Sequence, residues 1–178
     1  MTQDPISVRA LSPAEAQACI PALAAILVDC VDGGASVSFM APLAEAKARA
    51  FWQGVAEGVA VGDRILFAAT DDRSGEMLGT VQVILRQPEN QPHRADVAKM
   101  LVLRKARRHG LGARLMKAAE AGAREAGKTL LVLDTVSGTD AARLYERLGW
   151  IRVGEVPGYA LWPDGRPCPT TFYYRLLT

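Results

Sequence analysis

A short basic turn followed by two glycines is the clearest chemical feature of the sequence. Five side chains of this turn are basic or can become so: Arg104, Lys105, Arg107, Arg108 and His109. Gly110 and Gly112 follow at the start of an expected helix, where the missing Cβ atoms let a ligand approach the backbone. The first amides of a helix have no intrahelical partner, and the helix dipole favours anions there. The spacing therefore predicts a site for a phosphate or pyrophosphate group.

Other interpretations of this glycine-containing stretch fit less well. A dinucleotide-binding loop needs Gly-x-Gly-x-x-Gly directly after its strand, but Leu115 stands at the third position and the basic turn intervenes. A P-loop needs Lys and then Ser or Thr after its last glycine, whereas Ala113 and Arg114 follow Gly112. A basic solvated turn before an ordinary helix remains the alternative without a ligand.

Composition limits the classes of protein that this chain can represent. Its 178 residues, 49% hydrophobic and 22% charged, predict one globular domain over residues 1–178. A net charge of +2 is too small to indicate nucleic-acid binding, and no apolar run approaches the length of a membrane span. The three cysteines suit a reducing compartment, so we expect a cytoplasmic protein. No cysteine or histidine has neighbours at metal-ligand spacing, so no metal is expected.

Hydrophobic periodicity predicts seven strands and four helices along the chain. Helices are expected to begin near Pro13, Leu43, Gly110 and Thr139. Pro21 lies inside the first of them and predicts a kink or a restart. Strands are expected at 6–10, 64–70, 77–86, 96–103, 129–134, 150–156 and 170–177.

Two motifs in this order of elements resemble those of the GCN5-related N-acetyltransferase (GNAT) family. Arg107-x-x-Gly110-x-Gly112 is similar to the acetyl-CoA motif of that family, and Ala141-x-x-x-Tyr145-x-x-x-Gly149-Trp150 resembles its second motif. The resemblance implies the GNAT fold, an α/β (α+β) fold with a mixed central sheet of about seven strands flanked by four helices. It implies acetyl-CoA as co-substrate. It also implies a set of cofactor contacts, namely Met100, Leu101, Val102, Leu103, Arg107, Arg108, His109, Gly110, Leu111, Gly112 and Ala113.

Several further segments resemble the tabtoxin-resistance members of this family. They are residues 33–37 with Phe39 and Met40, then 94–97, 133–135, 153–159 and 163–166. This resemblance implies a small amino-acid-like acceptor with a primary amine, such as a toxin or an antibiotic. The glycine-rich loop at 32–40 either plugs the core or lines a substrate pocket. The candidate substrate contacts are Gly34, Ser36, Phe39, Met40 and Tyr159.

The sequence departs from the family pattern at four places. Arg104 stands where many members have proline, and Arg108 where many have glycine. The asparagine that often precedes the last helix is absent, and Gly138 and Thr139 lie there instead. Asp96 replaces the glutamate of the tabtoxin-resistance type, and its side chain is one methylene shorter.

Acetyl transfer to an amine needs a base, because an alkyl ammonium with a pKa of about 10 cannot attack before it loses a proton. Asp96 and Asp134 are the candidate bases, acting directly, through water, or only by binding the ammonium. Asp134 could instead cap a loop, and Asp96 could pair with Arg94 or Lys99. Tyr145 is the candidate general acid for the leaving thiolate, the alternative being a core tyrosine.

Three further functions remain open at the level of sequence. A non-catalytic acetyl-CoA sensor could use the same fold, and an acetyltransferase could act on a protein or peptide amine. A nucleic-acid binder using the basic turn would need more basic surface than this chain has. We therefore expect acetyl-CoA and a small amine as partners, and neither nucleic acid nor a membrane. The oligomeric state is left open, with a homodimer among the alternatives.

Overall fold

The computed structural model describes residues 5–177 and contains a mixed sheet of seven strands. The strands are β1 Ile6–Ala10, β2 Arg64–Asp71, β3 Met77–Ile84, β4 Arg94–Val102, β5 Leu130–Val136, β6 Ile151–Leu161 and β7 Pro167–Leu176. They lie in the order β1-β2-β3-β4-β5-β7-β6, and within this order β4 and β5 run parallel while the other neighbours run antiparallel. The mixed seven-stranded sheet expected from the sequence is confirmed.

Five α-helices flank the sheet within the described residues, where four were expected. They are α1 Pro13–Ala18, α2 Ile20–Asp32, α3 Glu45–Ala60, α4 Leu111–Glu125 and α5 Asp140–Arg147. The extra helix arises because the first expected helix ends at Cys19 and restarts with Pro21 in the first turn of α2, where its missing N–H costs no hydrogen bond. Ser12 and Glu15 form a capping box at the start of α1.

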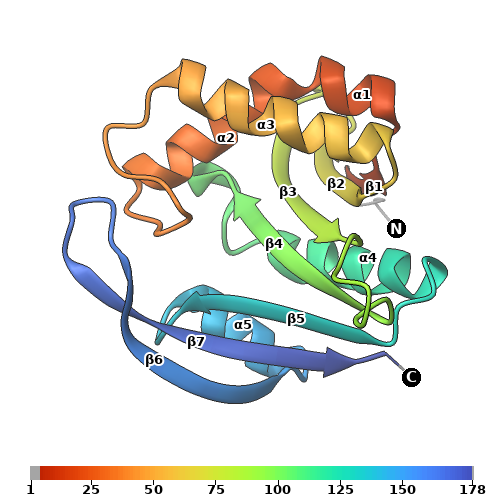
Figure 1. Ribbon diagram of the computed structural model, residues 1–178. Coiled ribbons are helices and arrows are strands. Elements are labelled where there is room, and N and C mark those ends of the chain that lie inside the picture. The colour runs from red at the N-terminus through yellow and green to blue at the C-terminus, as the bar shows by residue number, and fades with distance from the viewer. Residues whose placement is uncertain (1–4, 178) are drawn as a thin grey trace.

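The helices form two layers, with α1, α2 and α3 on one face of the sheet and α4 and α5 on the other (Figure 1). Successive side chains of β2 point to opposite faces of the sheet, so this strand contacts both helix layers. Leu66 and Ala68 pack with the first three helices, whereas Phe67 and Ala69 pack with α4. The sheet is therefore covered on both sides, and its centre is held rigidly between two apolar clusters.

The sheet opens in the middle, between its two parallel strands. Pairing of β4 with β5 ends at Asp96 opposite Val132, while β5 continues to pair with β7 as far as Val136. Beyond Asp96 the edge of β4 that faces β5 has no strand partner. The two strands thus part along their C-terminal halves, as Figure 1 shows.

A β-bulge lies in β4 at this opening. Gln82 of β3 pairs with Ala98 and Thr80 pairs with Leu101, so Lys99 and Met100 together stand opposite Val81. Lys99 has a φ of 52°. Bulges of this kind bend a strand and re-aim its side chains.

The loop between α2 and α3 closes one side of the opening by docking on the turn between β6 and β7. Ser36 Oγ donates to the Leu161 carbonyl at 2.6 Å, and the Ala41 amide donates to the Pro163 carbonyl at 3.0 Å. This loop, residues 33–44, lies beside the β6–β7 turn on the left of Figure 1. Segments more than a hundred residues apart therefore form one wall.

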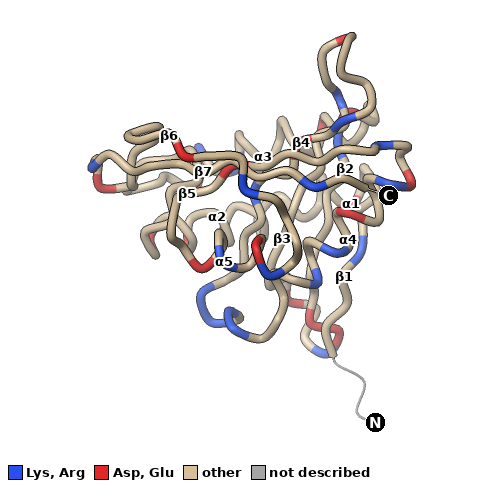
Figure 2. Tube along the Cα trace, turned by 90° about the horizontal axis from the view of Figure 1, so that it is seen from below, with Lys and Arg blue, Asp and Glu red and all other residues tan. Residues whose placement is uncertain are grey.

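Charges of both signs are spread along the whole trace, in keeping with the small net charge (Figure 2). Across residues 5–177, none of the helices combines the length and the apolar character needed to cross a bilayer.

Gly122 should be a sensitive packing position. A Cβ added there would lie 2.6 Å from Cζ of Phe67, a buried ring in the core between α4 and the sheet. We expect Gly122→Ala to lower the free energy of unfolding by about 1–3 kcal/mol through overpacking, measured by urea denaturation. Gly54→Ala in α3 is the control, because a Cβ there meets nothing within 4 Å. It should instead raise stability by about 0.5–1 kcal/mol through helix propensity, and equal effects of the two variants would contradict this account.

Candidate active site

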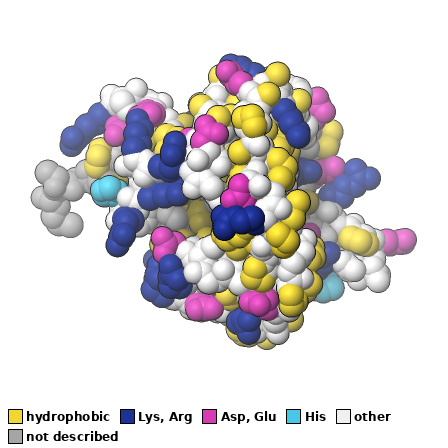
Figure 3. All heavy atoms as spheres, turned by 90° about the vertical axis from the view of Figure 1, so that its left-hand side faces the viewer, with side chains coloured by type: hydrophobic (Ala, Val, Ile, Leu, Met, Phe, Trp, Pro, Cys, Tyr) yellow, Lys and Arg dark blue, Asp and Glu magenta, His cyan; other side chains and the backbone are white. Residues whose placement is uncertain are grey.

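A cavity of about 1160 Å³ occupies the opening between β4 and β5. Its walls come from β4, β5, the first turn of α4, α5, the loop at 33–40 and the end of β6. Figure 3 views the side of the molecule that carries this loop, where hydrophobic side chains run down the middle of the face and Lys and Arg side chains gather beside them. We call this space the central cavity. Most of the candidate catalytic and binding residues line it.

The N-terminus of α4 forms one end of the central cavity. Gly110 caps this helix with a φ of 75°, and no side chain accepts hydrogen bonds from the first helical amides. Arg108 has a φ of 66°, a left-handed conformation that costs most residues energy and glycine none. Glycine would adopt this conformation without cost, so the departure from glycine to Arg108 carries a backbone cost in this chain.

Most of the basic charge in the turn is committed to other parts of the protein. Arg104 donates to Asp29 from both its backbone amide and its Nε, each at 2.8 Å, and Lys105 pairs with Glu76 at 2.6 Å. Arg107 Nε donates to the Val102 carbonyl at 3.1 Å. Arg108 lines the cavity, and its side chain makes no hydrogen bond or ion pair to any residue in the described part of the chain. The turn thus offers one uncommitted guanidinium.

Close packing of helices also requires glycine at position 112, whereas the sequence indicated only the approach of a ligand. A Cβ at this position would lie 2.8 Å from Cδ2 of Leu144 and 3.6 Å from Sδ of Met100. The absence of a side chain therefore lets α4 pack closely against α5 and β4. Gly112 lines the central cavity, but what it makes possible is helix packing as much as approach of a ligand.

The structure brings nine of the eleven expected cofactor contacts to the cavity wall. These are Met100, Leu101, Val102, Arg107, Arg108, Gly110, Leu111, Gly112 and Ala113. Leu103 does not line the cavity, and its amide already donates to the Leu78 carbonyl at 2.9 Å. His109 is exposed and also lies outside the lining.

Asp134 lies on the wall of the central cavity, near the end of β5. Desolvation by the surrounding protein raises the pKa of this carboxyl above its ordinary value, and the nearby charge of Asp96 adds to the rise. The ammonium of Lys99 acts in the opposite direction. A carboxylate with a raised pKa is a better proton acceptor than an ordinary one.

Tyr145 extends from α5 to the same cavity and is only 6% exposed. Its ring packs against Trp150 and Tyr173, with centroids 6.1 Å from each. Its hydroxyl makes no hydrogen bond to any residue between 5 and 177, and it is not among the fully buried polar atoms without a partner. Burial raises the pKa of this phenol, and the charge of Asp134 raises it further. The hydroxyl therefore keeps its proton at neutral pH and stands available to the cavity.

Asp96 does not line the central cavity. Its carboxylate pairs with Arg94 and accepts a hydrogen bond from Nε2 of Gln87 at 3.0 Å. The alternative of an ion pair with Arg94 is therefore what the structure contains. Of the two candidate bases, Asp134 is the one that faces the space where a ligand would bind.

All five expected acceptor contacts line the central cavity: Gly34, Ser36, Phe39, Met40 and Tyr159. Phe39 meets Phe51 edge-on at 5.4 Å between ring centroids, and Tyr159 meets Phe172 in the same way at 5.4 Å. Each ring is thus held by packing at one side of the cavity. The sequence left open whether this loop plugs the core or lines a pocket. The loop at 33–40 does both.

Lys99 is the cavity residue that sequence reasoning missed. Its Nζ donates to Ser38 Oγ at 3.0 Å and lies 5.6 Å from the centroid of the Phe51 ring. In a regular strand this residue would share a face with Val97 and Leu101, which are buried, and the bulge changes its direction. The available signal was a charged residue inside the apolar run from Val97 to Val102.

A P-loop pattern does occur in the chain, away from the cavity. Residues 122–129 read Gly-x-x-x-x-Gly-Lys-Thr. The structure places them at the C-terminal end of α4 and the turn after it, not between a strand and the start of a helix. Lys128 Nζ donates to the carbonyls of Leu85 and Pro92, at 3.0 and 2.7 Å. This match is therefore a structural turn and not a nucleotide site.

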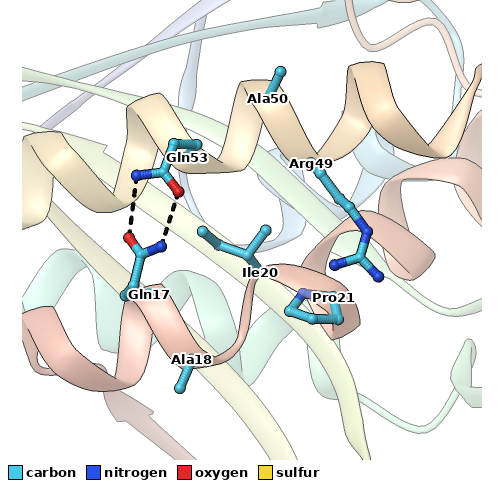
Figure 4. A pocket seen from close by; sticks show the side chains of 7 residues that line it. All are labelled: Gln17, Ala18, Ile20, Pro21, Arg49, Ala50 and Gln53. Atoms are coloured by element: carbon cyan, nitrogen blue, oxygen red, sulfur yellow. Dashed lines mark hydrogen bonds between the residues drawn. The ribbon is translucent and has the colours of Figure 1, made fainter.

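A second pocket of about 460 Å³ lies between the helices of the first layer (Figure 4). Gln17 and Gln53 cross it with two amide hydrogen bonds of 2.8 and 3.2 Å, and Arg49 at its edge pairs with Glu45. Its polar groups are satisfied by one another. No set of three or more His, Cys, Asp or Glu side chains within residues 5–177 is arranged to hold a metal ion. The central cavity remains the candidate active site.

A sheet that parts between two parallel strands, with an anion-favouring helix start beside the opening, defines the GNAT fold class. A sequence model of the Acetyltransferase (GNAT) family matches residues 36–150. This chain belongs to the GCN5-related N-acetyltransferase family.

Known proteins that resemble this chain differ in what they act on. A curated relative, an uncharacterized N-acetyltransferase encoded in the hisH–hisA intergenic region of Azospirillum brasilense, is 36% identical over 108 residues, covering 60% of this chain and 61% of the relative. The match thus spans about three fifths of that protein.

Two solved structures show the likeness of fold. A phosphinothricin acetyltransferase from Sinorhizobium meliloti in complex with acetyl-CoA has a TM-score of 0.76 at 18% identity, covering 98% of this chain and 89% of the other. A ribosomal-protein-alanine N-acetyltransferase from Brucella melitensis has a TM-score of 0.79 at 21% identity, covering 96% and 99%.

The left-handed conformation of Arg108 leads to a test by substitution. Arg108→Gly should raise the free energy of unfolding by about 1 kcal/mol, because glycine removes the Cβ penalty at a φ of 66°. Arg108→Ala removes the same charge but keeps a Cβ, so it should show no such gain. Guanidinium denaturation of the three proteins measures the difference. Equal stabilities of the Gly and Ala variants would show that the backbone here is not strained.

Proposed function

We propose that this chain transfers the acetyl group of acetyl-CoA to the primary amine of a small amino-acid-like acceptor, of the kind found among toxins and antibiotics. The observation that carries the proposal is the placement of Asp134 and Tyr145. A carboxyl with a raised pKa and a protonated phenol face one cavity, next to a helix start suited to an anion.

The residues around the cavity fit acetyl-CoA. The unpaired edge of β4 offers backbone amides to a carbonyl or amide group, and the start of α4 with Arg108 suits a pyrophosphate. The opening between the strands provides a path for an elongated ligand, and apolar residues such as Met100 and Leu144 line it. When bound, acetyl-CoA supplies an activated acetyl thioester.

The protein side of the reaction follows from the two ionisable groups. Asp134 holds the acceptor ammonium and takes a proton from it, directly or through a water molecule, so that the nitrogen lone pair can attack. Tyr145 donates its proton, or a hydrogen bond, to the sulfur as the carbon–sulfur bond breaks. The aromatic rings around Tyr145 hold the hydroxyl in position and exclude water.

A small acceptor agrees with the way the cavity is closed. The loop at 33–44 is hydrogen-bonded to the β6–β7 turn through Ser36 and Ala41, so the acceptor side has a continuous wall. A protein or peptide amine would need an open groove there. Similarity to the tabtoxin-resistance type points in the same direction, although relatives of this fold act on small molecules and on proteins.

The cellular setting and the assembly are also proposals. Cys19, Cys30 and Cys168 are free thiols, which supports a reducing, cytoplasmic compartment. The edge strand β6 exposes apolar side chains, among them Val153 at 67%, which supports a homodimer through that strand. Sedimentation of the purified protein distinguishes monomer from dimer.

Release of free CoA thiol tests the proposed activity. The panel is amino acids, β-lactam amino acids, polyamines and aminoglycosides, each with acetyl-CoA. Turnover with a member of the first two groups supports the proposal. Acetyl-CoA binding by calorimetry without turnover on any amine would indicate the sensor alternative instead.

Asp134→Asn should lower turnover by about 10²-fold or more at neutral pH, because the base is lost at nearly constant shape. The wild-type rate should rise as pH passes upward through the raised pKa of Asp134, since only the ionised carboxylate accepts a proton. The variant should lose this limb and recover in part near the acceptor pKa of about 10, where free amine is present. Asp96→Asn is the matched control, since Asp96 pairs with Arg94 outside the cavity lining; it should keep the base-dependent limb but move it to lower pH, because the charge of Asp96 adds to the rise in the pKa of Asp134. An unchanged pH–rate profile in the Asp134 variant would exclude the base assignment.

Tyr145→Phe should lower kcat by about 10²-fold while the KM for acetyl-CoA changes little, because the hydroxyl acts mainly in the transition state. Steady-state kinetics with a saturating acceptor separate the two parameters. Tyr173→Phe is the control, since that hydroxyl donates to Glu146 and lies outside the cavity lining. If the Tyr145 variant turns over at the wild-type rate, the tyrosine is a packing residue only.

A further inference from the structure

Lys99 carries a half-buried charge that no carboxylate within residues 5–177 neutralises by direct pairing. Its ammonium makes one hydrogen bond, to the hydroxyl of Ser38, and lies over the ring of Phe51. No carboxylate in residues 5–177 forms an ion pair with it, although ten other ion pairs are present there. A charge removed from water without a counter-ion is costly, so such a group usually awaits one.

The bulge in β4 is what places this ammonium in the cavity. Lys99 and Met100 share one position opposite Val81, and the φ of 52° at Lys99 turns its side chain away from the buried face of the strand. Lysine in a left-handed conformation is strained, and strained residues that persist cluster at ligand sites. The protein thus accepts a backbone cost and a desolvation cost at the same residue.

The partners of Lys99 locate it on the acceptor side. Ser38 belongs to the loop at 33–44, which carries the expected acceptor contacts, and Phe51 belongs to α3; neither is part of α4, where the pyrophosphate is expected. Lys99 and Asp134 both line the cavity and influence one another electrostatically, yet they form no ion pair. Two opposite charges held apart across one cavity are complementary to a zwitterion.

We propose that Lys99 binds a carboxylate of the acceptor while Asp134 binds its amine, so that the substrate class is amino acids with a free carboxylate. This inference rests on the proposed acetyl transfer and narrows its acceptor. Burial lowers the pKa of Lys99, and Asp134 partly restores it. A bound carboxylate would supply the counter-charge that the described residues lack.

Matched acceptors and matched variants test this role. Standard L-amino acids are compared with their carboxamides, which lose the negative charge at nearly the same shape, by CoA-thiol release. The variants are Lys99→Met and, as control, Lys47→Met. Lys47 also lies over an aromatic ring of this region, 5.9 Å from the centroid of Phe39, but it is exposed and outside the cavity lining.

Wild-type protein should have a KM about 10- to 100-fold lower for the preferred amino acid than for its carboxamide, as expected for a charge-assisted hydrogen bond. Lys99→Met should abolish most of this preference by raising the KM of the acid alone. The KM values for acetyl-CoA and for the carboxamide should stay unchanged. At neutral pH kcat should fall by the same factor for both acceptors, because loss of the Lys99 ammonium raises the pKa of Asp134. Lys47→Met should keep the full preference.

Several outcomes would overturn the inference. Equal KM values for acid and carboxamide in the wild type would do so, and so would acetylation of polyamines or aminoglycosides alone, which leaves the proposed acetyl transfer intact. An equal rise in KM for both acceptors in Lys99→Met, reproduced by Ser38→Ala, would assign Lys99 to holding the loop. Acetyl-CoA binding without turnover on any amine would refute the proposed function and this inference with it.

Discussion

The parting of β4 and β5 is the constraint on which the rest of this structure depends. Two parallel strands pair only as far as Asp96 and Val132, although β5 continues in register with β7 beyond that point. Unpaired backbone groups inside a protein need partners, and here they border the central cavity. A ligand with its own amide and carbonyl groups can supply those partners. The sheet is therefore both the scaffold and part of the binding site.

Other elements keep this opening from collapsing. The absence of a side chain at Gly112 lets α4 pack against Leu144 of α5, and the helix start is thereby fixed beside the gap. Arg104 pairs with Asp29 of α2, and Lys105 pairs with Glu76, the residue before β3. These two ion pairs hold the basic turn against both elements. The loop at 33–44 and the β6–β7 turn close the other side through backbone and hydroxyl hydrogen bonds. Rigid surroundings of this kind favour pre-organised binding.

The electrostatics of the cavity arise from burial more than from direct pairing. Asp134, Lys99 and Tyr145 all have a pKa shifted toward their neutral forms, with desolvation as the main cause. Within the described chain none of the three is in an ion pair. Ionisable groups with shifted pKa values and unused hydrogen-bonding capacity, gathered at one cavity, are suited to proton transfer and to binding charged substrates. The isolated ion pairs on the exposed surface contribute little to the free energy of unfolding.

Local patterns in the sequence were enough to predict the seven strands, four of the five helices and their succession along the chain; at Pro21 they left a kink or a restart open, and the structure contains a restart. Periodicity, capping residues and glycines act over a few residues, so they can be read directly. The glycine motif and the tyrosine motif also located one part of the cavity wall, because each short motif specifies its own local backbone geometry. The strand ends were less accurate: β6 extends to Leu161 because pairing with β7 holds it.

What the tertiary structure alone decided were the partners across long sequence distances. Arg104 meets Asp29 across 75 positions, and Lys105 meets Glu76 across 29, so two of the turn's four arginine and lysine charges are paired within the protein. Asp96 is withdrawn from the cavity by Arg94, and a bulge turns Lys99 into it. Sequence alone determined that this is a sheet protein with an anion-favouring helix start. Which charges remain free to act depends on strand register and on side-chain pairing, and these are settled only when distant segments pack together.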